Sequence, residues 1–435
     1  MTPSARFAAA IALLDAIAAT PRRPADATAT EFFRTRRYIG GGDRRAVSDT
    51  VWTTIRHTQR LDWHLLRHGA TPSPRLRALA AALLVDRITL PSLGALFADA
   101  RYGPPPPTAA EQALARGLAG RALVPPDMPE AIALNLPDWC LPGFRARFGD
   151  ALPAAMAAMD LPAPLDLRAN LLRTTRDAAR AALAAEGIET EPTPDSPWGL
   201  RAAPRLNVTA TQAFRDGLVE IQDEGSQLIA LLTAAAPGER VADLCAGAAG
   251  KTLALAAMMG NRGRISACDV SATRLEAATK RLRRAGADTV ERHLITPGDR
   301  WARRRAGSFD VVLVDAPCTG SGTWRRNPDA RLTGTPKDLA EVSEKQSVIL
   351  EGAVLLLRPG GRLVYATCSV LPEENEVQVD RVLARHPALR PLPLAEAWAR
   401  AGQPPPPPCA GPHLALAPHS HGTDGFFAAV LQRGA

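Results

Sequence analysis

From residue 241 to the end of the chain, strand-like and helix-like segments alternate, and this alternation constrains the fold more than any other feature. Short apolar runs predict the strands, and longer segments with apolar residues at every third or fourth position predict the helices. The predicted strands are 241–244, 264–268, 290–295, 309–314 and 362–366, and the clearest helices are 271–285 and 339–357. The alternation predicts a doubly wound α/β fold with a parallel sheet, which binds ligands at the carboxyl ends of its strands.

The part of the chain before this alternation has a different character. Residues 1–130 predict several helices separated by short Gly and Pro breaks, and residues 131–210 show the strand, helix and turn patterns of a small α+β unit. A chain of 435 residues is long enough for two or three domains. We therefore predict an all-α domain at 1–130, a small α+β linker domain at 131–210 and an α/β domain at 211–435.

The distribution of charge along the chain indicates what kind of molecule the protein binds. The net charge is +8, and residues 1–135 contain 17 Arg against 11 Asp and Glu, so +6 of it lies in the first third. A basic module in front of a nucleotide-type fold suggests a polyanionic partner such as RNA. Composition offers an alternative, because 48 of the 52 basic residues are Arg and a genome-wide bias would produce the same charge.

Other compositional features exclude several classes of protein. No apolar run reaches about 18 residues without a charge, so we expect no membrane span. The apolar segment near the N-terminus contains Asp15 and has helical spacing, which favours an amphipathic helix over a secretion signal. The six cysteines form no C-x-x-C pair, which argues against a zinc cluster, and their low density argues against a secreted disulfide framework. We expect a cytoplasmic protein with reduced thiols and no metal.

The turn after the first predicted strand, in "VADLCAGAAGKT" (241–252), is built like a nucleotide-binding turn. Both a P-loop and a dinucleotide fingerprint would need glycine at Cys245, which disfavours a P-loop NTPase. Nineteen residues after Gly250, Asp269 ends the second predicted strand, where a carboxylate is well placed to accept hydrogen bonds from ribose hydroxyls. The alternative role for Asp269 is the N-cap of the helix that starts near Ser271.

Two further predicted strands are each followed closely by a cysteine. The strand 309–314 continues into "DAPC", which contains Asp315 and Cys318, and the strand 362–366 continues into "TCS", which contains Cys368. Parallel strands bring both cysteines to the same edge of the sheet. One such cysteine would be an ordinary buried residue, whereas two beside the same predicted crevice indicate chemistry.

The stretches "DLCAGAAGKT", "DAPCTGSGTWRRNPD" and "LVYATCSVLPEENE" together resemble the motifs of the RsmB/Nop/Sun family of RNA cytosine-5 methyltransferases, which use S-adenosylmethionine (SAM). The resemblance runs in the right order from about residue 215 to the end. DNA cytosine-5 enzymes are similar but rely on the Pro-Cys cysteine alone, and amine methyltransferases have Pro-Pro-Tyr or Pro-Pro-Phe instead. The resemblance implies a Rossmann-like class I methyltransferase core with SAM as cofactor.

The N-terminal third resembles the helical NusB-like RNA-binding domain of the bacterial 16S ribosomal RNA members, by its helical content, its position and "GGDRRAVSDTVW". This implies RNA as the partner, with ribosomal RNA first. Transfer RNA is the alternative substrate, and a catalytically inactive ribosome-assembly factor on the same fold is the alternative function.

The resemblance also implies roles for individual residues. Cys368 would attack carbon 6 of cytosine, and Cys318 would assist release of the product. Asp315, protonated or sharing a proton, would act near N3 of the base. The residues implied in cofactor binding are Cys245, Ala246, Gly247, Ala248, Ala249, Gly250, Lys251, Asp269, Asp299 near the adenine, and Asp315. Lys251 is alternatively an exposed residue of the first helical turn.

Three arginines follow the Cys318 motif, Arg325, Arg326 and Arg331, and we expect them to contact RNA phosphates. The alternative is that these arginines lie in a solvated basic loop. The target base must be unpaired or flipped out to reach Cys368, which suits exposed RNA loops.

The cofactor turn departs from the family pattern, which is Ala-Ala-Pro-Gly-Gly-Lys. Here Ala248 and Ala249 stand in place of the proline and the first of the two glycines. We therefore expect Ala249 to avoid a positive φ, since alanine is disfavoured there.

Overall fold

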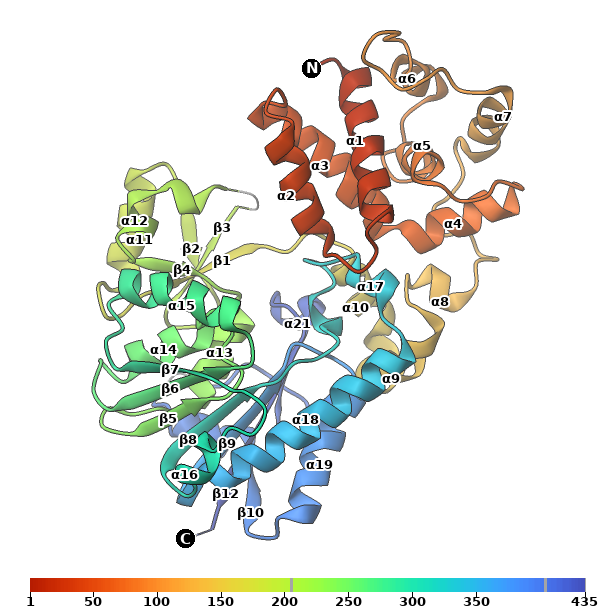
Figure 1. The fold of residues 1–435 in the computed structure, drawn as a ribbon. Helices are drawn as coiled ribbons and strands as arrows, with labels where there is room; N and C mark the ends of the chain where they lie inside the picture. The colour runs from red at the N-terminus through yellow and green to blue at the C-terminus, as the bar shows by residue number, and fades with distance from the viewer. Residues whose placement is uncertain (204–205, 403–404, 435) are drawn as a thin grey trace. The chain divides into compact units, whose positions relative to one another are not determined.

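The computed structural model describes residues 1–203, 206–402 and 405–434, and the chain forms two compact units (Figure 1). The helical unit comprises Met1–Pro142, Asp150–Asp160 and Trp324–Thr335, and the α/β unit comprises Gly143–Gly149, Leu161–Thr323 and Pro336–Ala435. No helix of the described residues is long and apolar enough to cross a membrane.

The helical unit buries apolar residues at helical spacing. In α3, for example, Val47, Val51 and Ile55 recur every fourth residue and all three are buried in its core. Side-chain caps define several helix starts, among them the capping box of Thr108 and Glu111. Its helices are α1 (Pro3–Ala18), α2 (Ala25–Thr35), α3 (Gly41–Arg56), α4 (Thr58–Arg67), α5 (Pro74–Leu84), α6 (Leu90–Ala95), α7 (Ala109–Leu118), α8 (Glu130–Ala133), α10 (Leu152–Met159) and α17 (Ala330–Thr333), while α9 (Leu141–Phe148) contributes to both units.

The segment 324–335 belongs to the helical unit, although its place in the sequence put it in the predicted α/β domain. Arg331 forms an ion pair with Asp160 at 2.7 Å, and Asp160 also pairs with Arg60 at 2.7 Å. Trp139 donates from its indole nitrogen to the carbonyl of Gly334. These long-range contacts could not be read from sequence order.

The α/β unit contains a small antiparallel sheet with strand order β2-β3-β1-β4. Its core includes Leu167 and Val219 from the strands and Leu183 from the helix α11. The elements are β1 (Leu165–Ala169), α11 (Arg176–Ala185), β2 (Thr190–Pro192), β3 (Gly199–Ala202), α12 (Gln212–Arg215) and β4 (Val219–Ile221).

The second sheet of this unit has the order β10-β12-β9-β8-β5-β6-β7, with β11 paired to β12. Strands β5 to β9 run parallel, whereas β12 is antiparallel to β9 and β10 is antiparallel to β12. The strands are β5 (Arg240–Asp243), β6 (Arg264–Asp269), β7 (Val290–Leu294), β8 (Phe309–Asp315), β9 (Leu357–Thr367), β10 (Leu389–Leu392), β11 (Leu414–Leu416) and β12 (Phe426–Arg433).

Helices cover both faces of this sheet. Val311 and Leu313 of β8 pack into one core with helices α13 to α15, and Val312 and Val314 pack into the other core with α16, α18 and α19. The helices are α13 (Glu224–Leu232), α14 (Gly250–Met258), α15 (Ala272–Ala285), α16 (Trp301–Arg304), α18 (Pro336–Leu356), α19 (Glu376–Arg385), α20 (Leu394–Ala399) and α21 (Pro418–His421). This confirms the predicted doubly wound α/β fold.

The topology directs attention to one edge of the sheet. β5 lies between β6 and β8, so the chain order reverses around it. Ligands of such sheets bind outside the carboxyl ends of the strands at this reversal. The turn after β5 and the loop after β8 both begin there.

Candidate active site

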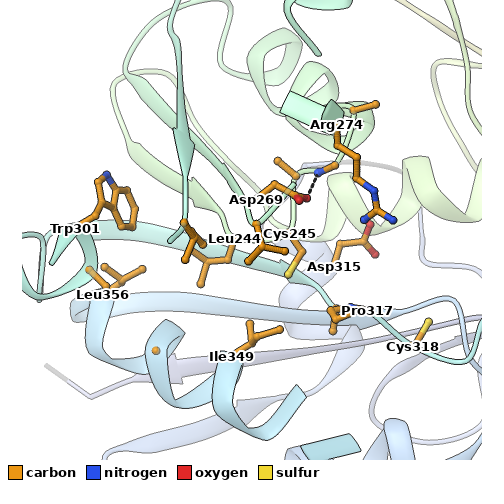
Figure 2. Close-up of a pocket in the computed structure, with 18 of the residues that line it drawn as sticks. Leu244, Cys245, Asp269, Arg274, Trp301, Asp315, Pro317, Cys318, Ile349 and Leu356 are labelled. Carbon is orange, nitrogen blue, oxygen red and sulfur yellow. Dashed lines mark hydrogen bonds between the residues drawn. The ribbon is translucent and has the colours of Figure 1, made fainter. Parts of the chain in front are cut away.

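A cavity of about 620 Å³ opens at the carboxyl ends of β5, β6, β8 and β9 (Figure 2). Backbone and small side chains of the turn after β5 form part of its wall, and apolar side chains form much of the rest. Its lining residues are Leu244, Cys245, Ala246, Gly247, Ala248, Asp269, Val270, Arg274, Ile295, Asp299, Trp301, Ala302, Asp315, Ala316, Pro317, Cys318, Ile349, Gly352, Leu356 and Cys368.

The turn after β5 contains an unexpected backbone conformation at Ala249. This alanine is the N-cap of α14 and adopts the left-handed region, with φ 64° and ψ 30°. The expectation that Ala249 avoids a positive φ is therefore wrong, and the left-handed conformation costs about 1–2 kcal/mol for an alanine. The chain needs it because the backbone reverses here between the strand and the helix, and the Ala249 amide donates to the carbonyl of Ala246 at 2.8 Å.

Asp269 holds this turn from the end of β6. Its carboxylate accepts a hydrogen bond from the backbone amide of Gly247 at 2.8 Å (Figure 2). It also accepts from the amide of Ser271 at 2.7 Å. The N-cap of α15 is Ser271, whose hydroxyl accepts from the Arg274 amide, so the N-cap alternative for Asp269 is wrong. Asp269 lines the cavity, where the sequence placed a ribose contact.

Asp299 also lines the cavity, between β7 and α16. Its carboxylate accepts from the Trp301 amide at 2.8 Å and lies 2.5 Å from Nε2 of His293. The His293 contact is the main cause that lowers the pKa of Asp299. The His293 ring stacks on Trp301, with ring centroids 5.1 Å apart.

Sequence reasoning missed the apolar wall of the cavity. Val270 follows Asp269 directly and is 75% exposed, and Ile295 and Trp301 complete the wall near Asp299. Val270 could have been found from the sequence, because it is an apolar residue directly after the carboxylate that ends a predicted strand. The indole of Trp301 carried no comparable signal, because its position depends on packing against Phe309 in β8.

The two cysteines meet at the end of the cavity. Cys318 follows β8 and Cys368 follows β9, and their sulfur atoms are 3.3 Å apart. The hydrogen bond to Cys368, burial and the charges of Cys368 and Glu374 raise the pKa of Cys318. The pair is thus arranged so that Cys318 keeps its proton.

A buried glutamate, Glu374, ties the two cysteine loops together. Its side chain accepts hydrogen bonds from the amide and the hydroxyl of Thr319, at 2.8 and 2.6 Å. It also accepts from the Ser369 hydroxyl and from Nε2 of Gln346. The residues after Cys318 and Cys368 therefore share one carboxylate. The sequence contains this residue in "PEENE" but gives no sign that it bridges the two loops.

We expect Glu374→Gln to lower the rate of a reaction that uses the two cysteines by about 10- to 100-fold, because an amide cannot accept all four of these hydrogen bonds. The dissociation constant of a ligand bound in the cavity should stay unchanged, since Glu374 does not line the cavity. Single-turnover kinetics and calorimetry measure the two quantities. The exposed neighbour Glu373→Gln is the matched control, and an equal rate loss in both variants would contradict the role.

Asp315 ends β8 and pairs with Lys251 of α14, with Nζ and Oδ2 2.6 Å apart. Lys251 is buried, so its alternative as an exposed first-turn residue is wrong. Asp315 lines the cavity, whereas Ala249, Gly250 and Lys251 of the predicted cofactor set lie behind the lining.

The three predicted RNA-contacting arginines differ in exposure. Arg331 is 2% exposed and paired to Asp160, and Arg325 is 5% exposed, both within the helical unit. Both guanidinium groups are enclosed, so neither presents an exposed surface to RNA phosphates in this structure, and the contact of these two residues with RNA stays a prediction. Arg326 is exposed, and its contact with RNA stays a prediction.

Asp243 at the end of β5 predicts a pH dependence of stability. Burial raises its pKa from 3.8 to about 7, and the charge of Asp315 adds to this effect, against the hydrogen bond from Thr252. Between pH 3.8 and about 7, Asp243 keeps its proton in the folded state but has lost it in the unfolded chain, so the free energy of unfolding falls as the pH rises.

We expect Asp243→Asn to remove this slope, because the amide does not ionise. The free energy of unfolding of the variant minus that of wild type should rise by roughly 3 kcal/mol from pH 5 to pH 8. Urea unfolding at both pH values measures the difference. A difference between variant and wild type that is independent of pH would contradict the raised pKa.

Comparison with known proteins gives two family matches. Residues 230–432 match the model of the 16S rRNA methyltransferase RsmB/F family, and residues 136–209 match the ferredoxin-like domain of RsmF/B-like methyltransferases. The two matches cover the large sheet and most of the small one.

Full-length proteins give a consistent result. The probable ribosomal RNA small subunit methyltransferase B of Synechocystis sp. is 31% identical over 420 residues, which cover 90% of this chain and 91% of the relative. The corresponding methyltransferase B of Pasteurella multocida is 33% identical over 68% of this chain and 65% of its own length.

Two solved structures are also similar. The crystal structure of PH0851 is 25% identical with a TM-score of 0.80, over 100% of this chain and 99% of that one. A methyltransferase homolog protein from Pyrococcus horikoshii is 28% identical with a TM-score of 0.59, over 70% of this chain and 97% of that one.

Proposed function

The chain belongs to the RsmB/F family of 16S rRNA methyltransferases, and on this premise we propose that it transfers a methyl group from SAM to carbon 5 of a cytosine in RNA. The first candidate substrate is 16S ribosomal RNA. The observation that carries the proposal is the pair of thiols 3.3 Å apart at the end of the cavity that Asp269 and Asp315 line.

The cavity fits SAM by its chemistry. Asp269 offers a carboxylate to ribose hydroxyls, and Val270 and Trp301 offer apolar surface to the adenine ring. The turn 245–248 brings backbone and small side chains close to the cavity, and SAM, which has no phosphate, needs no cradle of amides there. When bound, SAM supplies the methyl group as an electrophile.

Cys368 is the proposed nucleophile. Its thiolate forms a bond to carbon 6 of cytosine, the electron pair of the 5,6 double bond shifts to form a double bond between carbons 4 and 5, and the pair of the former double bond between carbon 4 and N3 moves onto N3. Carbon 5 is then the nucleophilic carbon of an enamine. The ring nitrogen N3 takes up a proton in this step. The Asp315 and Lys251 pair supplies that proton, because the ammonium donates to the carboxylate at 2.6 Å.

Cys318 is the proposed base for product release. The hydrogen bond to Cys368 is the first cause that raises the pKa of Cys318, followed by burial and by the charge of Cys368. The two causes that involve Cys368 vanish once its sulfur is bonded to carbon 6, whereas burial remains. Cys318 then gives its proton to solvent, and its thiolate removes the proton on carbon 5, while N3 returns its proton to the Asp315 carboxylate. The carbon–sulfur bond breaks as the 5,6 double bond forms again, which frees Cys368.

The test uses the full chain, methyl-labelled SAM and unmethylated small ribosomal subunit RNA, followed by bisulfite sequencing of the product. We expect label in 5-methylcytosine at discrete positions. Label on transfer RNA alone would change the proposed substrate, and SAM and RNA binding without any transfer would favour an inactive assembly factor.

A further inference from the structure

Side chains outside the cavity hold the cofactor turn in place. Arg281 of α15 donates from a guanidinium nitrogen to the carbonyl of Ala248 at 2.7 Å. Arg168 of β1 donates to the carbonyl of Gly250 at 3.0 Å. With Asp269 on the Gly247 amide, charged groups bind three of the four residues from 247 to 250.

The two arginines lie beside a buried carboxylate of the small sheet. Glu220 of β4 is 2% exposed and pairs with Arg281 at 3.1 Å and with Arg284. Arg168 is fully enclosed and donates to Oε1 of Gln222 at 2.6 Å. Burial lowers the pKa of Arg168 to about 10, so it stays charged at neutral pH.

These hydrogen bonds restrict a turn whose own residues leave its backbone free to move. Neither Ala248 nor Ala249 restricts the backbone as proline does, and Ala249 adopts a strained conformation with φ 64°. A turn that is mobile before the cofactor binds must be ordered on binding, which weakens affinity. Hydrogen bonds from a charged donor to the turn carbonyls oppose that mobility and are stronger than neutral ones.

We propose that Arg281 is a positioning residue for SAM: anchored by Glu220 of the small sheet, it fixes the Ala248 carbonyl and so presets the turn that lines the cofactor cavity. The small sheet thereby acts in cofactor binding. The proposal concerns cofactor affinity and does not depend on the reaction at carbon 5.

The direct test compares Arg281→Ala with Arg284→Ala by calorimetric titration with SAM. Both arginines leave α15 to pair with Glu220, but only Arg281 reaches the turn. We expect Arg281→Ala to raise the SAM dissociation constant about tenfold or more, and Arg284→Ala to change it less than about twofold. Equal effects of the two substitutions, or no effect of either, would overturn the proposal.

A second comparison separates turn positioning from damage to folding. In the double substitution A248P/A249G, proline restricts φ at 248 and glycine adopts the left-handed conformation at 249 without strain, so Arg281→Ala in that background should cost less than about threefold in SAM affinity. The same tenfold cost in both backgrounds would overturn the proposal. Should Arg281→Ala fail to fold, Arg281→Lys, which keeps the charge beside Glu220 but not the guanidinium geometry, takes its place in both comparisons.

Discussion

Replacement of Cys368 by alanine is expected to abolish methyl transfer, with a rate loss of at least about 1000-fold. Without its sulfur no bond forms to carbon 6, and carbon 5 of cytosine is too weak a nucleophile to accept the methyl group. The SAM dissociation constant should change less than about twofold, because the turn after β5 and Asp269 are untouched. Filter-binding assays with labelled SAM and calorimetry measure the two quantities.

The control for Cys368→Ala is Cys409→Ala, which removes another partly buried thiol of the same unit that does not line the cavity. The control should retain wild-type activity. Appreciable methyl transfer by Cys368→Ala would disprove the covalent mechanism, even though the chain belongs to a methyltransferase family.

Replacement of Cys318 by alanine is expected to trap the enzyme covalently on its RNA. Cys368 can still add and the methyl group can still be transferred, but no base lies 3.3 Å from Cys368 to remove the proton on carbon 5. The adduct should appear as a slower band on a denaturing gel, labelled from methyl-labelled SAM, and turnover should fall by about 100-fold or more.

The double variant Cys318→Ala/Cys368→Ala distinguishes this adduct from non-specific cross-linking, since it retains neither thiol and should form no band. Complete turnover by Cys318→Ala, with no adduct at any time point, would exclude the release role. An adduct that persists in the double variant would show that a different residue attacks the base.

Much of the α/β unit follows from sequence because its signals are local. The predicted strands 264–268 and 309–314 correspond to β6 and β8, each one residue longer in the structure. Buried parallel strands are continuous apolar runs that end at polar residues, so their carboxyl ends, and with them Asp269, Asp315 and Cys318, could be assigned to one edge.

The errors arose where the role of a residue depends on distant partners. Arg331 seemed a surface cation in a basic loop, yet Asp160, far away in the sequence, encloses it in the helical unit. Ala249 seemed unable to take a positive φ, yet the contacts of the neighbouring turn residues with Arg281, Arg168 and Asp269 hold the backbone there. Single-residue preferences are worth about 1–2 kcal/mol, which a few charge-assisted hydrogen bonds exceed.

The sequence by itself determined the α/β fold, the order of its motifs and the presence of two cysteines at one edge of the sheet. It could do so because hydrophobic periodicity and the ends of strands are properties of short segments. Only the tertiary structure decided which groups act together. The sulfur atoms of Cys318 and Cys368 meet at 3.3 Å, Glu374 joins their loops, and Glu220 of the small sheet anchors Arg281 at the cofactor turn. Each of these contacts joins separate elements, so packing sets their distances and no local pattern encodes them.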